Sequence, residues 1–198
     1  MMKKYPILLS FLILILFGFT QLFSMTLLSK EEALKQMFPD VDNVITENVT
    51  ISNSDLEILK KNLGGSLVHF QSGSQSEEVT ESAELTFYYG IKNGRKTSVA
   101  IIDHQPGKWG PVQYIILLDL ATAKVKNLAV MSYKEKRGRP IARKSFLKQF
   151  IGKRSGDPVQ VRKDIRAISG ATISSDATCF AVKKAIAIVE TVILKKEA

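Results

Sequence analysis

The chain has 198 residues, which is enough for one globular domain and a short appendage. Its only cysteine, Cys179, excludes an intrachain disulfide and a cysteine-ligated metal cluster. The net charge of +9 is concentrated between Lys134 and Arg166, where twelve basic residues stand against three acidic ones, so the rest of the chain is about neutral.

An uncharged segment rich in Leu, Ile and Phe runs from Tyr5 to Ser29, directly after Lys3 and Lys4. It exceeds the ~20 apolar residues that cross a bilayer core, and it lacks the small-residue exit of a cleaved signal peptide. We therefore predict an uncleaved anchor, with a cleaved signal as the alternative; a core helix would need a polar face. The two lysines favour a cytoplasmic N-terminus. The expected location is the cell membrane, single-pass, with the soluble domain on the extracytoplasmic side.

The next part of the sequence predicts two short helices separated by a strand, followed by a polar turn. These elements are expected at residues 30–38, 41–51, 54–62 and 71–78. Pro39 ends the first helix, and Ser54 or Asp55 caps the second.

Four strands are predicted in direct succession from Leu85 onward. They are expected at residues 85–91, 97–102, 112–120 and 125–133. Asn93-Gly94 is a strong hairpin signal between the first two. Successive strands joined by short turns predict an antiparallel meander.

Two helical segments close the chain. Pro140 begins the first, which reaches Phe150 and is expected to bury Phe146, Leu147, Phe150 and Ile151. The second spans residues 176–195, and seven of its apolar side chains share one face. These are Ala177, Phe180, Ala181, Ala185, Ile188, Val189 and Val192. Cys179 lies among them and is interpreted as a small buried side chain.

The predicted fold class is therefore α+β: an antiparallel sheet meander packed with helices, preceded by one N-terminal transmembrane or signal segment. The expected parts are residues 1–29 as the membrane anchor or signal segment, 30–84 as the N-terminal part of the soluble domain, and 85–198 as its C-terminal unit.

The most informative motif lies just before the last helix, where residues 166–175 read Arg-Ala-Ile-Ser-Gly-Ala-Thr-Ile-Ser-Ser. Small residues leave the backbone accessible, and a helix start offers free N–H groups and the positive end of the helix dipole. Both features favour a phosphate. An ordinary turn with Ser174 or Ser175 as helix cap is the alternative. Lys148, Lys153 and Lys163 are candidate cationic partners or solvated surface lysines.

Three segments carry a resemblance to a known family: residues 146–153 (Phe-Leu-Lys-Gln-Phe-Ile-Gly-Lys), Asp157-Pro158 and residues 164–175. They closely resemble the extracytoplasmic FMN-binding domain family. That family includes the covalent-flavin subunits of the Rnf complex and of the sodium-pumping NADH:quinone reductase. The resemblance runs from about Leu85 to Val192, so it implies that residues 85–198 are an FMN-binding domain.

The resemblance implies that FMN is the cofactor, joined through its phosphate to Thr172 as phosphothreonyl-FMN by a flavin transferase that uses FAD. The implied cofactor-binding residues are Thr172, Ser169, Gly170, Ala171, Ser174 and Ser175. Membrane redox proteins are the implied partners. The protein would be an electron-transfer flavoprotein subunit rather than a self-contained enzyme, with no catalytic residue of its own.

Two positions depart from the family pattern. An acidic residue usually stands three positions before the serine, where this chain has Arg166, with Asp164 two residues earlier. The loop from Lys134 to Pro140 lacks the Thr-Pro-Gly-Leu-Gly pattern of the Rnf and quinone-reductase subunits. The cofactor is therefore carried over, but the identity of the complex is not. A flavin-free interaction or assembly module of the same fold is the alternative.

Other signals point to weaker interpretations. The basic segment suits nucleic-acid phosphates, but the predicted anchor argues against such a partner; contact with anionic lipid remains compatible. His69 and His104 have no neighbours at metal-ligand spacing. Trp109, Tyr114 and Tyr133 either stack on the flavin ring or pack in the protein.

Overall fold

The computed structural model describes residues 25–74, 79–134 and 139–195. The predicted anchor up to residue 24, part of the polar turn and most of the loop between Lys134 and Pro140 lie outside these ranges. Among the helices of the described ranges, none combines the length and the apolar character needed to span a bilayer.

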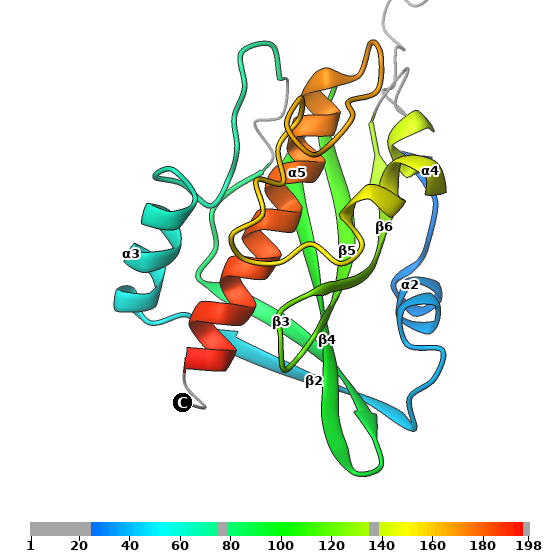
Figure 1. Cartoon of the computed structure of the whole chain (residues 1–198), viewed down its shortest axis with the longest axis vertical. Helices are drawn as coiled ribbons and strands as arrows, with labels where there is room; N and C mark the ends of the chain where they lie inside the picture. The colour runs from blue at the N-terminus through cyan, green and yellow to red at the C-terminus, as the bar shows by residue number, and fades with distance from the viewer. Residues whose placement is uncertain (1–24, 75–78, 135–138, 196–198) are drawn as a thin grey trace, which may run out of the picture.

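Within the described residues, six strands form one antiparallel sheet in the order β1-β6-β5-β4-β3-β2 (Figure 1). Their bounds are β1 Met25–Thr26, β2 Asn43–Thr50, β3 Glu84–Lys92, β4 Arg95–Pro106, β5 Pro111–Asp119 and β6 Val125–Tyr133. The run from β3 to β6 is the predicted meander, and β2 extends it by pairing with β3. The α+β prediction is confirmed. The two-residue strand β1 was not predicted, because so short a segment carries no alternation.

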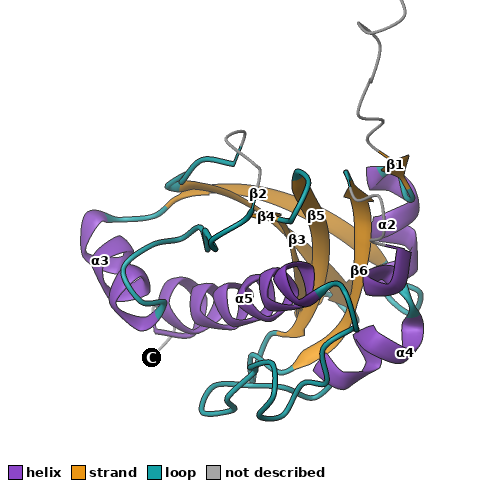
Figure 2. Ribbon diagram, turned by 90° about the horizontal axis from the view of Figure 1, so that it is seen from above, coloured by secondary structure: helices purple, strands orange, loops and turns teal. Residues whose placement is uncertain are grey.

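The helices cover both faces of this sheet (Figure 2). Their bounds are α2 Lys30–Met37, α3 Asn53–Asn62, α4 Lys144–Leu147 and α5 Thr172–Ile188, with 3₁₀ turns at Arg139–Ala142 and Lys148–Phe150 and a π-helical end at Val189–Leu194. The predicted cap of α3 was wrong by two residues. Ser52 is the cap and its hydroxyl accepts a hydrogen bond from the Asp55 N–H at 3.2 Å, because Ser52 is the last extended residue.

The helix predicted from Pro140 to Phe150 is broken into short pieces. After Phe150 the backbone becomes extended at Ile151, and Gly152 then adopts a φ of 82°. The Gly152 N–H donates to the Val125 carbonyl at 2.7 Å, which attaches this turn to the start of β6. Ile151 is consequently 44% exposed, so its predicted burial was wrong.

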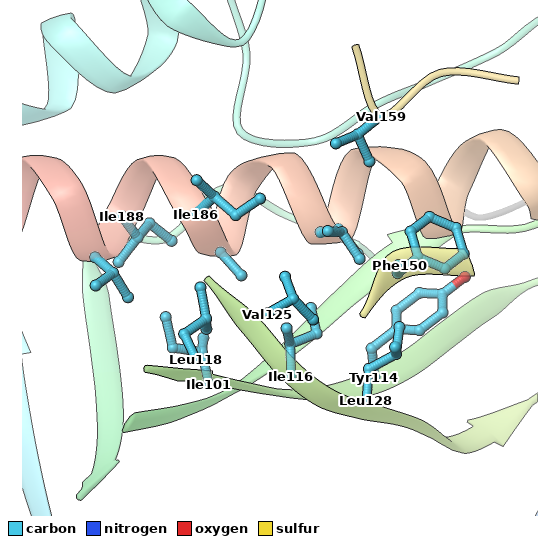
Figure 3. Packing of buried hydrophobic residues seen from close by; sticks show 14 of the residues in the cluster. Ile101, Tyr114, Ile116, Leu118, Val125, Leu128, Phe150, Val159, Ile186 and Ile188 are labelled. Carbon is cyan, nitrogen blue, oxygen red and sulfur yellow. The ribbon is translucent and has the colours of Figure 1, made fainter. Parts of the chain in front are cut away.

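The main core lies between α5 and one face of the sheet. Figure 3 shows β5 side chains, including Ile116 and Leu118, packed below Ile186 and Ile188 of α5. The seven apolar residues predicted to share one face of the last helix are all buried. On the opposite sheet face the alternate β5 residues, Ile115 among them, form a second core with α2. Period-two alternation along β5 therefore fills two cores at once.

Cys179 offers a direct check on the main core, because its thiol is buried in α5. Burial, reinforced by the negative charge of Asp176, raises the pKa of this thiol to about 12. An unfolded cysteine ionises near 8.5, so the native thiol stays protonated at pH 8 while the unfolded one is partly thiolate. We expect a disulfide reagent to modify Cys179 at least ~100-fold more slowly in native protein than in urea-denatured protein. The thiolate that the reagent releases on reaction measures the rate. Above about pH 9 the same difference in pKa favours unfolding. Equal reaction rates in both states would contradict the burial.

Candidate functional site

The Ser-Gly-Ala-Thr turn leads directly into α5, which begins at Thr172 and not after Ser175. Thr172 is the first helical residue, and its side chain is exposed. The residue before it, Ala171, is the N-cap and provides no side-chain hydrogen bond. The start of α5 therefore presents a hydroxyl beside backbone N–H groups that the side chain of its N-cap residue does not satisfy.

Glycine is required in this turn for its conformation rather than for space. Gly170 has a φ of 76°, which is the left-handed region, and a Cβ built there would meet nothing within 4 Å. Gly170 and Ser169 are both exposed, whereas Ala171 is buried and fixes the turn to the protein. The backbone before Thr172 is thus open to a bound group.

Ser174 and Ser175 lie beneath the turn and are fully buried. The Ser175 hydroxyl donates to the Ala171 carbonyl at 2.9 Å and accepts from the Ile168 N–H at 3.2 Å. The Ser175 N–H also donates to the Ala171 carbonyl. Ser175 therefore holds the turn in place from inside. Its N–H and hydroxyl are already committed, which leaves Thr172 and Ile173 as the outermost amides of the helix.

A second clamp holds the segment that precedes the turn. Gln149 accepts from the Arg166 N–H at 2.8 Å and donates to the Arg166 carbonyl at 3.2 Å. This amide ties the end of the α4 region to the loop that carries Thr172. This role of Gln149 could not be predicted from the sequence, because a glutamine at a polar helical position is usually solvated.

Asp164 organises the same loop from its other end. Its carboxylate accepts from the Val159 N–H at 3.0 Å, the Gln160 N–H at 2.8 Å and the Lys153 ammonium at 2.7 Å. Burial alone would raise the pKa of Asp164, but these three donors outweigh it and hold the pKa below its ordinary value. Asp164 is therefore engaged within the loop and is not a substitute for the acid that Arg166 replaces.

The structure places the three lysines predicted as cationic partners in different surroundings. Lys153 is paired with Asp164, and Lys148 lines a different groove, next to β6. Lys163 lines an open pocket of about 740 Å³ that ends at Ile168, immediately before the turn. Arg162 and Arg166 line the same pocket and were not among the lysines predicted as cationic partners. The positive charge closest to the turn along the chain is thus contributed by this loop.

On the other side of α5, residues 66–74 run along the start of the helix, a segment named here the strap (Figure 1). The Gln71 side chain donates to the Ile173 carbonyl at 3.2 Å. His69 stacks on Phe180, with ring centroids 5.0 Å apart. Burial lowers the pKa of His69, so this ring is neutral at pH 7. The strap therefore packs on α5 without adding charge.

The aromatic candidates occupy different environments. Tyr114 is fully buried, with its hydroxyl 3.1 Å from Thr178 Oγ1, so it packs in the core and does not stack on a surface ligand. Tyr133 is also buried, and its hydroxyl donates to the sulfur of Met25. Trp109 is partly exposed in the turn between β4 and β5. Among the residues that the structure describes, no group of three or more His, Cys, Asp or Glu side chains is placed to hold a metal ion.

The donor set at the start of α5 fits the phosphate of a nucleotide-like cofactor. It combines an exposed hydroxyl, the first amides of a helix whose N-cap residue gives no side-chain hydrogen bond, an open glycine turn and a cationic loop that precedes it in the chain. The buried hydroxyls below the turn keep this arrangement in one geometry before any ligand arrives.

The comparison with family models points to the same region. Residues 107–187 match the family model described as FMN-binding domain, a range that includes the turn and Thr172. The search of curated proteins found no matching sequence. Among solved structures, the crystal structure of Shewanella oneidensis NqrC is similar, with 13% identity and a TM-score of 0.48 over 80% of this chain and 84% of that one. So distant a likeness transfers no property from that protein. Residues 107–187 are therefore an FMN-binding domain, and FMN is its cofactor.

Proposed function

We propose that this protein is a membrane-anchored flavoprotein that carries FMN on Thr172 and relays electrons between membrane redox proteins outside the cytoplasm. The observation that carries the proposal is the exposed side chain of Thr172, the first residue of a helix that lies inside the matched FMN-binding domain. The uncharged segment from Tyr5 to Ser29 supports the anchoring.

The residues around Thr172 suit a phosphodiester, which keeps one negative charge. The first amides of α5 and the helix dipole favour that charge, and Arg162, Lys163 and Arg166 supply positive potential nearby. Bound FMN supplies the electron transfer. The chain itself tethers the group, fixes the geometry of its attachment and sets the local electrostatics. The electron transfer itself needs no general acid or nucleophile of the protein.

A flavin transferase would attach the group with FAD as the donor. The Thr172 oxygen would bond to the phosphorus of the FMN part, the bond from that phosphorus to AMP would break, and the hydroxyl proton would leave. Exposure of Ser169, Gly170 and Thr172 in one turn gives such an enzyme access to the hydroxyl.

The mass of intact protein purified from its own host tests the proposal. We expect the polypeptide plus one covalently bound FMN, with flavin absorbance that remains after denaturation and gel filtration. The same spectrum reports whether the segment before residue 25 is retained. Flavin that is lost on denaturation would contradict the phosphoester but not FMN binding. A bare polypeptide without flavin bands would contradict both.

Arg166 favours a second candidate, a flavin-free interaction or assembly module, because the family usually has an acid at this position. Arg166 is exposed and only its backbone is clamped by Gln149, so Arg166→Asp leaves the loop bonds intact. If the native protein carries no flavin and Arg166→Asp acquires it under the same conditions, the flavin-free function is the correct one.

A further inference from the structure

A groove of about 570 Å³ runs between β6, the end of α2 and the α4 region, and is named here the β6 groove. Its apolar lining includes Leu27, Leu128, Leu147 and Ile151. Two of these, Leu27 and Ile151, are 38% and 44% exposed, and Met25 next to the groove is 40% exposed. The described part of the chain has four large exposed hydrophobic side chains: Leu27 and Ile151 line this groove, Met25 is two residues before Leu27, and Phe70 lies on the strap.

The polar lining of the β6 groove has one sign of charge. Lys126, Lys144 and Lys148 line it, all three are exposed, and none of its described lining residues is acidic. Apolar side chains bordered by lysines match the boundary of a bilayer that contains anionic lipid, where headgroups attract the ammonium groups and the apolar side chains enter the interface. A protein partner would need a matching acidic and apolar face, for which the chain offers no indication.

The course of the chain places this groove near the predicted anchor. Leu27 lines it, and Leu27 itself belongs to the uncharged segment from Tyr5 to Ser29. Strand β1 joins that segment to the sheet by pairing with β6. A chain that leaves the bilayer just before Met25 therefore brings the β6 groove to the membrane surface within a few residues.

We propose that the β6 groove docks the domain on the surface of a bilayer containing anionic lipid, so that the domain does not swing freely on its anchor. The proposal rests on the proposed membrane anchoring. Leu147 and Lys148 of the α4 region line the groove, whereas Phe146 and Gln149 line the pocket formed with residues 162–168. Ser169, Gly170 and Thr172 do not line the groove, so docking there leaves Thr172 uncovered.

The experiment uses the full chain reconstituted into nanodiscs and an environment-sensitive fluorophore at a single cysteine. Cys179 is buried and its pKa is raised to about 12, so it is not labelled in the native protein. Ile151→Cys places the label in the β6 groove, and Phe70→Cys, on the strap and 59% exposed, is the control. We expect a blue shift of the Ile151→Cys label in nanodiscs with anionic lipid, a much smaller one in zwitterionic nanodiscs, and no difference for Phe70→Cys.

Neutralising the lysines separates docking from simple proximity. Each lysine near an anionic surface contributes roughly a fivefold change in the docking equilibrium. Lys126, Lys144 and Lys148 changed together to Gln should therefore lower docking by roughly a hundredfold and remove the blue shift. In the control variant, Lys61, Lys92 and Lys195, which are also exposed, are changed to Gln. This variant should retain the blue shift. High salt should act like the groove variant because it shortens the screening length.

The outcomes are distinct. Two results would overturn the docking and leave the anchoring intact, provided that the protein is held in the nanodisc. In the first, the Ile151→Cys label shows the same fluorescence as the Phe70→Cys label; in the second, its blue shift is equal in anionic and zwitterionic nanodiscs. A blue shift of the Ile151→Cys label that appears without lipid, and only when a second purified protein is added, would identify a protein partner instead. A full chain that does not incorporate into nanodiscs would overturn the anchoring and this proposal together, whereas covalent flavin on Thr172 would be unaffected.

Discussion

Changing Thr172 to alanine is expected to give a protein that folds normally and carries no covalently bound flavin. Thr172 is exposed, it is the first residue of α5, and its hydroxyl is the atom proposed to bond to the FMN phosphorus. Surface substitutions away from special contacts change the free energy of unfolding by about 0.5 kcal/mol or less. The effect should therefore fall on the cofactor and not on stability. Intact mass and flavin fluorescence of the denatured protein measure it.

Two matched variants complete this test. Thr172→Ser keeps a hydroxyl on the same helical residue and should retain at least part of the covalent flavin. Ser169→Ala removes an exposed hydroxyl from the same turn and should retain all of it. If Thr172→Ala keeps the mass of bound FMN, the attachment lies elsewhere. If Ser169→Ala loses the flavin while Thr172→Ala keeps it, the bond has been assigned to the wrong residue of the turn.

The meander from β3 to β6 could be predicted from the sequence because each of its strands carries a local signal. Alternation along β3 to β6, with Asn93-Gly94 between the first two, specifies neighbouring antiparallel strands without any knowledge of the rest of the fold. The buried face of α5 follows in the same way from helical spacing, and all its predicted residues are buried. These features depend on residues that are close in sequence.

The parts that could not be predicted depend on contacts between distant segments. The start of α5 was placed after Ser175, since serines commonly cap helices, but Ser175 instead bonds backward to Ala171 and Ile168. The clamp of Gln149 on Arg166 joins residues 17 positions apart. Such side-chain to backbone bonds leave no periodic trace. The candidate site at Thr172 follows from the sequence motif and stays a prediction, whereas the contacts that hold its turn in place emerged only from the structure.

The exposed and the buried residues of the candidate site have different roles. Ser169, Gly170 and Thr172 are exposed and form the part that a ligand can reach. Ser175 and Gln149 are turned inward or along the loop and fix the backbone. A preorganised turn loses less conformational entropy when a phosphate group binds to it or is attached to it.

The second large effect is expected at a buried ion pair that joins α5 to the sheet. Lys184 donates to Asp103 of β4 at 2.6 Å, and both side chains are about nine-tenths buried. Gln105 donates to the other Asp103 oxygen at 2.8 Å and accepts from the His69 N–H at 3.0 Å, so the pair also secures the strap. Lys184→Met removes one charge and leaves a buried carboxylate with a neutral partner. We expect a loss of about 3 kcal/mol in the free energy of unfolding, measured by urea denaturation.

A matched control and a double variant distinguish this charge effect from a general effect on the helix. Lys183→Met alters the adjacent, half-buried position and should cost no more than about 0.5 kcal/mol. Adding Asp103→Asn to Lys184→Met removes the stranded charge while keeping an acceptor for Gln105, so it should recover most of the lost stability. If Lys184→Met unfolds no more readily than Lys183→Met, or if the double variant is as unstable as the sum of its parts, the pair does not hold α5 on the sheet. Lys184 lies in α5, so loosening this pair should also increase amide exchange along the helix that begins at Thr172.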